Sequence, residues 1–182
     1  MKLGLEEYLI LDRQAERNSE YYDGELFPVV DAGIAHTTLE MNLAGILQPR
    51  LRKTGCSGHP SLRIRVSPTQ YVYPDLAIIC GQPNLTDETA DTATNPRIIL
   101  EILSPSTADY DHGGKFELYR LLLSFEEYLL VSQDKPLVKI FRKQSPNDWS
   151  LQIVSDMDAP VRIQSLGIEF PLGELYEGIT FQ

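Results

Sequence analysis

The sequence predicts an α/β fold, with a central mixed β-sheet flanked by helices. Two continuous apolar runs, YPDLAIIC at residues 73–80 and RIILEIL at residues 97–103, are typical of central strands covered on both faces. Other stretches repeat apolar residues at helical spacing or alternate them with polar residues. Strands interleaved with a few helices in 182 residues indicate a single mixed α/β domain.

The chain is expected to begin with a short helix and a β-hairpin. Residues 4–17 place a few apolar side chains among charges, which is the pattern of a short amphipathic helix. Asp23 and Gly24 form an Asp-Gly dipeptide between apolar stretches, a strong signal for a tight hairpin turn. Strands are therefore predicted near residues 20–23 and 25–30.

A longer helix and a half-exposed strand are expected next. Residues 35–53 are predicted to form the helix, and Pro49 is predicted to end or bend it in its last turn. SLRIRVS at residues 61–67 alternates apolar and basic side chains, which is the period of a strand with one exposed face. The apolar residues that define the helix are Leu39, Leu43, Ile46, Leu47 and Leu51.

The second half of the chain is expected to combine strands with one more helix. Residues 81–96 are polar and turn-rich, so they are predicted to form a surface loop that borders a site. Residues 109–123 are predicted to form a helix whose first turn is weakened by Gly113 and Gly114. Further strands are expected at EYLLVS (127–132), LVKIFRK (137–143), WSLQIVS (149–155) and VRIQSL (161–166), and a helical turn at GELYEGI (173–179).

Charge is unevenly distributed along the chain. The net charge is −10, which argues against a protein that coats nucleic acid through bulk electrostatics. Residues 41–74 contain no acidic residue and carry +5, so the remainder carries −15. The basic side chains there form either a solvated face or a local phosphate-facing patch, and the sequence does not decide between the two. They are Arg50, Arg52, Lys53, Arg63 and Arg65.

The sequence also indicates the compartment. It has no run of about 18 apolar residues that would span a membrane, and its N-terminus lacks the apolar core of a signal peptide. Two cysteines in a chain of this length do not indicate a disulfide framework. Cys80, at the end of an apolar strand, is expected to be a small buried hydrophobic residue. The expected compartment is therefore the cytosol.

Two acidic residues stand in the predicted central strands, and one is surrounded by Ile and Leu. Burying Glu101 alone would cost several kcal/mol unless a cation or hydrogen-bond donors met its carboxylate. Asp75 stands at the start of the other apolar run, just after Pro74. If both carboxylates face the same side of the sheet, they form a pair of oxygen ligands suited to a hard divalent cation such as Mg²⁺.

The order Pro74-Asp75 and then Glu101 in an apolar strand resembles the PD-(D/E)xK restriction-endonuclease-like superfamily. More closely, YPDLAIIC, LEILSPST, DYDHGGKFELYR and EEYLLVS resemble its bacterial Uma2-type branch, long grouped under a domain of unknown function. The likeness runs from YYDGEL to about LVKIFRK. The expected divisions are an N-terminal helix and hairpin at residues 1–33, a nuclease core at residues 34–143, and C-terminal strands at residues 144–182.

The resemblance implies metal-dependent hydrolysis of phosphodiester bonds. Asp75 and Glu101 would hold Mg²⁺ or Mn²⁺, with the backbone carbonyl of Ile102 as a further ligand. The simplest superfamily pattern has a lysine two residues after the glutamate, where this chain has Leu103. The branch carries a lysine on the following helix, and Lys115 matches that position. Lys115 would orient the attacking water or stabilise the oxyanion of the transition state.

Other residues are candidates for supporting roles. Glu25 in the hairpin and Glu40 on the helix would each supply an additional carboxylate, with Glu25 slightly favoured. His36 would contact the substrate or satisfy the start of its helix, and Tyr119 would pack beside Lys115 or belong to the core. The principal residues also have structural interpretations: Asp75 as a turn cap, Glu101 paired with Arg97 or Arg63, and Lys115 exposed and paired with Asp111.

Three functions are consistent with the sequence. The first is a DNA endonuclease that requires Mg²⁺ or Mn²⁺, with a homodimer expected because cutting both strands needs two sites. The second is a binding or regulatory module that keeps the fold without activity, which Leu103 in the lysine position would permit. The third is a metal-dependent hydrolase acting on RNA or nucleotides, because a fold does not determine its substrate.

Overall fold

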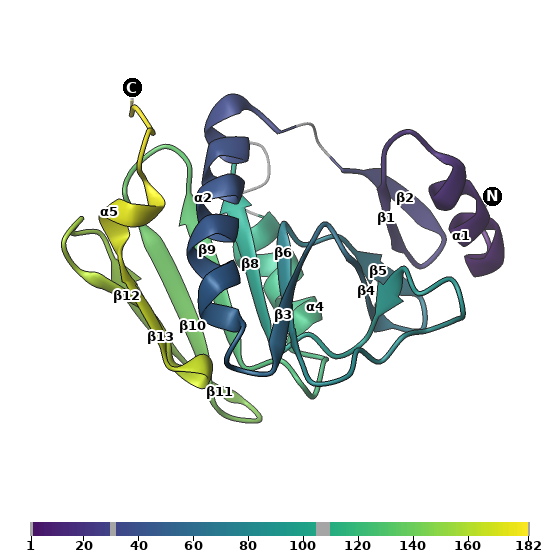
Figure 1. Cartoon of the computed structure of the whole chain (residues 1–182). Helices are drawn as coiled ribbons and strands as arrows, with labels where there is room; N and C mark the ends of the chain where they lie inside the picture. Colours follow the sequence, from purple (N-terminus) through teal and green to yellow (C-terminus); the bar gives the residue numbers. More distant parts are fainter. Residues whose placement is uncertain (1, 30–31, 105–109, 182) are drawn as a thin grey trace.

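The computed structural model describes residues 2–29, 32–104 and 110–181, and two β-sheets organise these residues (Figure 1). The larger sheet has six strands, of which β8 and β9 run parallel while every other neighbouring pair is antiparallel. The predicted mixed sheet is therefore confirmed. Its strands are, in spatial order, β11 (Asp148–Val154), β10 (Val138–Ser145), β9 (Glu127–Ser132), β8 (Ile98–Leu103), β6 (Leu76–Cys80) and β3 (Cys56–Pro60).

The second sheet has five strands and includes the predicted hairpin. Asp23 and Gly24 form its turn with φ of 48° and 99°, the left-handed backbone that an Asp-Gly hairpin turn requires. Strands β12 (Pro160–Ile163) and β13 (Ile168–Pro171) form a separate pair. The strands of the second sheet are, in spatial order, β2 (Glu25–Pro28), β1 (Ser19–Tyr22), β5 (Gln70–Val72), β4 (Arg63–Ser67) and β7 (Thr92–Ala93).

Helices cover both faces of the six-stranded sheet. Figure 1 shows α2 lying across one face, with the unit of α1, β1 and β2 at one end of the molecule and β12, β13 and α5 at the other. Pro49 lies inside the last turn of α2 and does not end the helix, which continues to Leu51. The helical segments are α1 (Leu5–Gln14), α2 (Ile34–Leu51), the π-helix η1 (Asp111–Lys115), α4 (Phe116–Tyr119), the 3₁₀ turn η2 (Gln164–Leu166) and α5 (Leu172–Leu175).

Several predicted elements are shorter than expected; α1 ends at Gln14 and α5 at Leu175. The helix predicted for residues 109–123 ends at Tyr119, because the backbone N–H groups of Leu121 and Leu122 bond three residues back and tighten the chain into turns. Its first residue, 109, lies outside the described residues. The strand predicted for residues 161–166 ends at Ile163, where η2 begins.

Each central strand contributes to two apolar cores. Along β8, Ile98, Leu100 and Ile102 pack into the core under α2. Ile99 and Leu103 pack into the core on the opposite face, with residues of α4. Glu101 falls between Ile99 and Leu103 in the alternation, so its carboxylate points to the α4 side of the sheet. The strand pattern therefore determines the face on which the candidate site forms.

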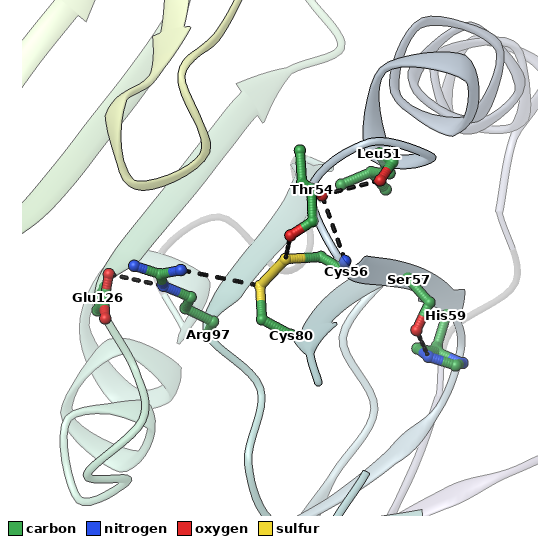
Figure 2. The surroundings of a disulfide bond; sticks show 8 residues. All are labelled: Leu51, Thr54, Cys56, Ser57, His59, Cys80, Arg97 and Glu126. Carbon is green, nitrogen blue, oxygen red and sulfur yellow. Dashed lines mark hydrogen bonds and ion pairs between the residues drawn. A yellow bond between two sulfur atoms is a disulfide. The ribbon is translucent and has the colours of Figure 1, made fainter. Parts of the chain in front are cut away.

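The cysteine prediction was wrong. Cys56 and Cys80 form a disulfide, and neither is fully buried (Figure 2). The two residues are direct partners in the antiparallel ladder of β3 and β6, which brings their side chains together. Arg97 lies beside the sulfur of Cys80 and forms an ion pair with Glu126. The bond therefore ties the edge strand β3 to the strand that Asp75 precedes.

Within the described residues, no helix is both long enough and apolar enough to cross a membrane.

Replacing Cys56 and Cys80 together with Ser is expected to lower the free energy of unfolding by about 3 kcal/mol. The bond closes a loop of 24 residues, and opening it restores chain entropy to the unfolded state. Urea denaturation would measure the loss, and dithiothreitol should reproduce it in the wild type but add nothing in the double variant. Two titratable thiols in the unreduced native protein would contradict the disulfide.

Candidate metal centre

Asp75 and Glu101 meet on the α4 side of the sheet. Asp75 immediately precedes β6, and Glu101 lies in the middle of β8, its antiparallel neighbour. The Oδ2 atom of Asp75 accepts a hydrogen bond of 2.6 Å from the backbone N–H of Ile102. The Asp75 N–H donates in turn to Oε2 of Glu101 at 3.4 Å. The condition that the sequence left open, that both carboxylates face one side, is therefore met.

Glu101 is almost completely buried, with 2 % of its surface exposed. Its Oε1 atom accepts hydrogen bonds from Lys115 Nζ at 3.1 Å and from the Tyr119 hydroxyl at 2.8 Å. Burial raises the pKa of Glu101 well above its usual range, and Lys115 and Tyr119 oppose that rise. The alternative interpretation, a pairing of Glu101 with Arg97 or Arg63, is not what the structure has: the cation beside this carboxylate is Lys115, at the end of η1.

Lys115 ends the π-helix η1 and is buried, contrary to its interpretation as an exposed lysine. Besides Glu101, its ammonium lies 3.5 Å from both Glu20 and Asp111. It also donates to the backbone carbonyl of Tyr73 at 3.4 Å. Burial lowers the pKa of Lys115, but the surrounding carboxylates outweigh it and hold that pKa well above its usual value. The lysine is therefore a fixed positive charge.

A second group of ligand atoms surrounds the other oxygen of Asp75. His36 and Glu40 stand one turn apart on α2, and the Nε2 atom of His36 lies 3.3 Å from Asp75 Oδ1 and 3.5 Å from Glu40 Oε1. The ligand atoms of all three residues lie within 4.8 Å of one another. Burial lowers the pKa of His36, but hydrogen bonds to Asp75 and Glu40 raise it to about 10. Asp75 thus contributes one oxygen to each group.

Glu20 is the residue that sequence reasoning missed, and Glu25 was the wrong choice. Glu20 is 6 % exposed, contacts Lys115 and accepts a hydrogen bond from the Tyr73 N–H at 3.1 Å. Glu25 is exposed on the edge strand β2 and lines no part of the cavity described below. The available signal was the alternation of β1, which places Glu20 and Tyr22 opposite the core residue Tyr21.

Tyr110 approaches the cluster because of a glycine. Its hydroxyl donates to Glu20 Oε2 at 3.1 Å, and its ring lies 5.9 Å from the ammonium of Lys115. A Cβ atom built at Gly114 would lie 2.7 Å from the Tyr110 ring, closer than any side chain tolerates. Gly114, expected only to weaken the helix, therefore makes room for this tyrosine.

These residues line one cavity of about 500 Å³. Five of its side chains carry carboxyl groups and two are basic, so the negative charge exceeds what Lys115 and His36 neutralise. Carboxylate and carbonyl oxygens are the ligands that Mg²⁺ and Mn²⁺ prefer, and an added cation would offset the excess. The donor set therefore fits a divalent metal, which Asp75, Glu101 and the backbone carbonyl of Ile102 would hold, with Glu40 as a further carboxylate beside Asp75.

The five basic residues of the segment from 41 to 74 do not form one patch. Arg63 is 2 % exposed and pairs with Asp12 and Asp91, because β4 turns this side chain into the interior under α1. Its assignment to a phosphate-facing surface was wrong. Arg50 pairs with Glu174 and Arg65 is half-buried, whereas Arg52 and Lys53 are exposed.

Comparison with known proteins now identifies the chain's relatives. The profile of the Uma2 family, described as "Putative restriction endonuclease", matches residues 5–173. The chain belongs to this family. Two relatives from Synechocystis sp. share its length: Uncharacterized protein slr1290 is 30% identical over 99% of this chain and 94% of its own. Uncharacterized protein sll1609 is 31% identical over 89% of this chain and 93% of its own.

A solved structure has the same fold. A crystal structure from Anabaena variabilis, titled as a putative nuclease belonging to DUF820, superposes with a TM-score of 0.79 over 99% of both chains. Sequence identity is 16%, so this likeness shows the fold and not the activity. The mixed sheet with flanking helices is therefore the architecture of that protein as well, and the Uma2 resemblance predicted from the sequence is confirmed.

Replacing Lys115 with Met is expected to lower the free energy of unfolding by about 3–5 kcal/mol, because Glu20, Glu101 and Asp111 lose the cation they share. Mg²⁺ or Mn²⁺ should stabilise this variant more than the wild type, since a bound cation offsets the same repulsion. Thermal and urea denaturation with and without metal would measure both effects.

The control is Lys135→Met, which removes an exposed lysine outside the cavity and should change stability little. The charge balance would be contradicted by a Lys115→Met protein that is as stable as the wild type. It would also be contradicted if metal stabilised this variant no more than it stabilises the wild type.

Proposed function

We propose that this chain is a divalent-metal-dependent endonuclease that hydrolyses phosphodiester bonds in DNA. The observation that carries the proposal is the convergence of Asp75, Glu101 and Lys115 in an acidic cavity, with Lys115 Nζ 3.1 Å from Glu101. The description of the Uma2 family as a putative restriction endonuclease supports the same class of reaction. A hydrolase of this kind needs a cation to offset phosphate charge and a donor beside the reacting oxygen.

The protein's own residues would position the reacting groups. Mg²⁺ or Mn²⁺, when bound, lowers the pKa of a coordinated water and neutralises charge that develops on the phosphate. Asp75 and Glu101 present their oxygens from neighbouring strands, and the Tyr119 hydroxyl orients Glu101 through the bond to Oε1. The Lys115 ammonium would donate to the attacking water or to a phosphate oxygen, held at the required place by Glu20 and Asp111.

The position of Lys115 also bears on the alternative of an inactive binding module. That alternative arose because Leu103 occupies the strand position of the superfamily's lysine. Leu103 is buried in the apolar core on the α4 side of the sheet, and an ammonium reaches Glu101 from the helix instead. The charge that the chemistry requires is thus present in the same region. This favours an enzyme over a module whose site has decayed.

A homodimer is part of the proposal, because cleavage of both strands of a duplex takes two active sites. DNA is the proposed partner despite the net charge of −10, since recognition would depend on local groups and not on the whole surface. RNA and nucleotides remain the competing substrates, and they are included in the test below.

Wild-type protein is expected to cleave plasmid or single-stranded DNA with Mg²⁺ or Mn²⁺ and not with EDTA. Glu101→Gln should abolish cleavage by removing a metal ligand, and Lys115→Met should reduce its rate by about 10²- to 10³-fold by removing a transition-state donor. Glu117→Gln, which changes an exposed carboxylate on α4 just after Lys115, is the matched control and should cleave normally.

The outcomes separate the candidate functions. Cleavage of RNA alone, with the same dependence on Glu101 and Lys115, would assign the site to RNA. Absence of metal binding together with absence of cleavage of DNA, RNA and nucleotides would favour the inactive binding module. Cleavage that persists in Glu101→Gln would show that the activity arises elsewhere and would refute the proposed site.

A further inference from the structure

A second cavity of about 470 Å³ adjoins the metal centre and shares Glu40, Asp75 and Ile102 with it. It is a groove between α2 and the edge strand β3. From Glu40 to Arg52 the helix advances by about 18 Å at roughly 1.5 Å per residue. The buried side chains of its floor are apolar: Leu43, Leu47, Leu51 and Leu76.

The charges along the groove are strongly asymmetric. At the metal end lie Glu40 and Asp75, and no other described residue that lines the groove is acidic. At the far end Arg52 is exposed, with Lys53 next to it in the chain, and neither makes an ion pair with any described residue. The groove thus runs from a cation-binding end, over an apolar floor, to a free guanidinium.

We propose that this groove binds the segment of nucleic-acid strand on one side of the cleaved bond, with unpaired bases on the apolar floor and a phosphate at Arg52. The inference rests on the proposed function and specifies its substrate as DNA that is single-stranded or locally unpaired at the site. The span of about 18 Å is several times the roughly 3.4 Å spacing of a stacked strand, so the groove is long enough for a short segment of unstacked nucleotides.

A nucleic-acid strand carries its charge on its phosphates, and these are unfavourable on the apolar floor. A phosphodiester loses hydration on an apolar surface and gains nothing in return, whereas an unpaired base buries its faces there favourably. The metal end would hold the scissile phosphate, and Arg52 is the next described cation along the floor. In a duplex the faces of each base are covered by the bases stacked above and below it, so none is left for the Leu side chains and a duplex fits this floor less well.

Gly58 provides a way to fill the groove without disturbing the fold. A Cβ atom at Gly58 would lie 3.4 Å from Leu51 Cδ1 and 3.5 Å from Leu76 Cδ1, which are ordinary contacts above the floor. Gly58→Leu therefore places a side chain in the groove. Gly45→Leu is the matched control, because Gly45 lies on α2 outside the groove and a Cβ atom there would meet nothing within 4 Å.

The test uses the full chain, a fluorescent single-stranded oligonucleotide and the small diester bis(p-nitrophenyl) phosphate, which reaches only the metal centre. Gly58→Leu is expected to weaken oligonucleotide binding in Ca²⁺ about tenfold and to raise KM for its cleavage similarly. The loss should be at least tenfold greater for the oligonucleotide than for the small diester.

Arg52→Ala should weaken binding and reduce the slope of log affinity against log salt by about 0.7. Gly45→Leu should match the wild type on both substrates.

Other results would overturn the inference. If Gly58→Leu and Arg52→Ala bind and cleave the oligonucleotide as the wild type does, the groove is not the strand site, although the proposed nuclease stands. If Gly58→Leu changes the sedimentation coefficient and leaves oligonucleotide binding intact, the groove instead holds a second copy of the chain. Absence of hydrolysis of both substrates by the wild type refutes the proposed function, and the binding measurement then decides the groove separately.

Discussion

The structure depends on the compensation of one buried carboxylate. Glu101 stands in the middle of a strand whose other residues are Ile and Leu, and it is 2 % exposed. A carboxylate in that place is tolerated only where donors and a cation meet it. Lys115 and the Tyr119 hydroxyl supply them from the helical segment that covers the sheet. The same contacts therefore fix the position of that helical segment on the sheet and the arrangement of charges in the site.

Tyr73 connects this cluster to the N-terminal unit. Its backbone N–H donates to Glu20 and its carbonyl accepts from Lys115, while its hydroxyl contacts Asp12 of α1 and the guanidinium of Arg63. Arg63 and Asp12 form a buried ion pair. Removing either partner would leave the other as an uncompensated buried charge and would destabilise the fold. The hairpin that carries Glu20 is thus held in register with the site by a second charge network, which explains why an arginine is buried there.

Local patterns predicted the elements of the fold but not every partner in the site. The Asp23-Gly24 turn, the apolar repeat of α2 and the alternation along β8 are encoded in neighbouring residues, and each was predicted. Glu20, Arg63 and the Cys56–Cys80 bond depend on which strands pair and in what register. Glu20 and Glu25 stand on either side of the hairpin turn, yet β1 and not β2 lies beside β5, which leads into Tyr73.

Leu103 stands two residues after Glu101, and the ammonium that contacts Glu101 comes from Lys115 of η1 instead. A lysine at residue 103 would share a sheet face with Glu101, but that face also holds the apolar core that Leu103 helps to fill. Placing the ammonium on η1 leaves the core apolar and brings Glu20 and Asp111 within 3.5 Å of the same nitrogen. The cavity around Lys115 is lined by five carboxyl groups, which carry more negative charge than one lysine neutralises. This excess negative charge favours binding of a divalent cation.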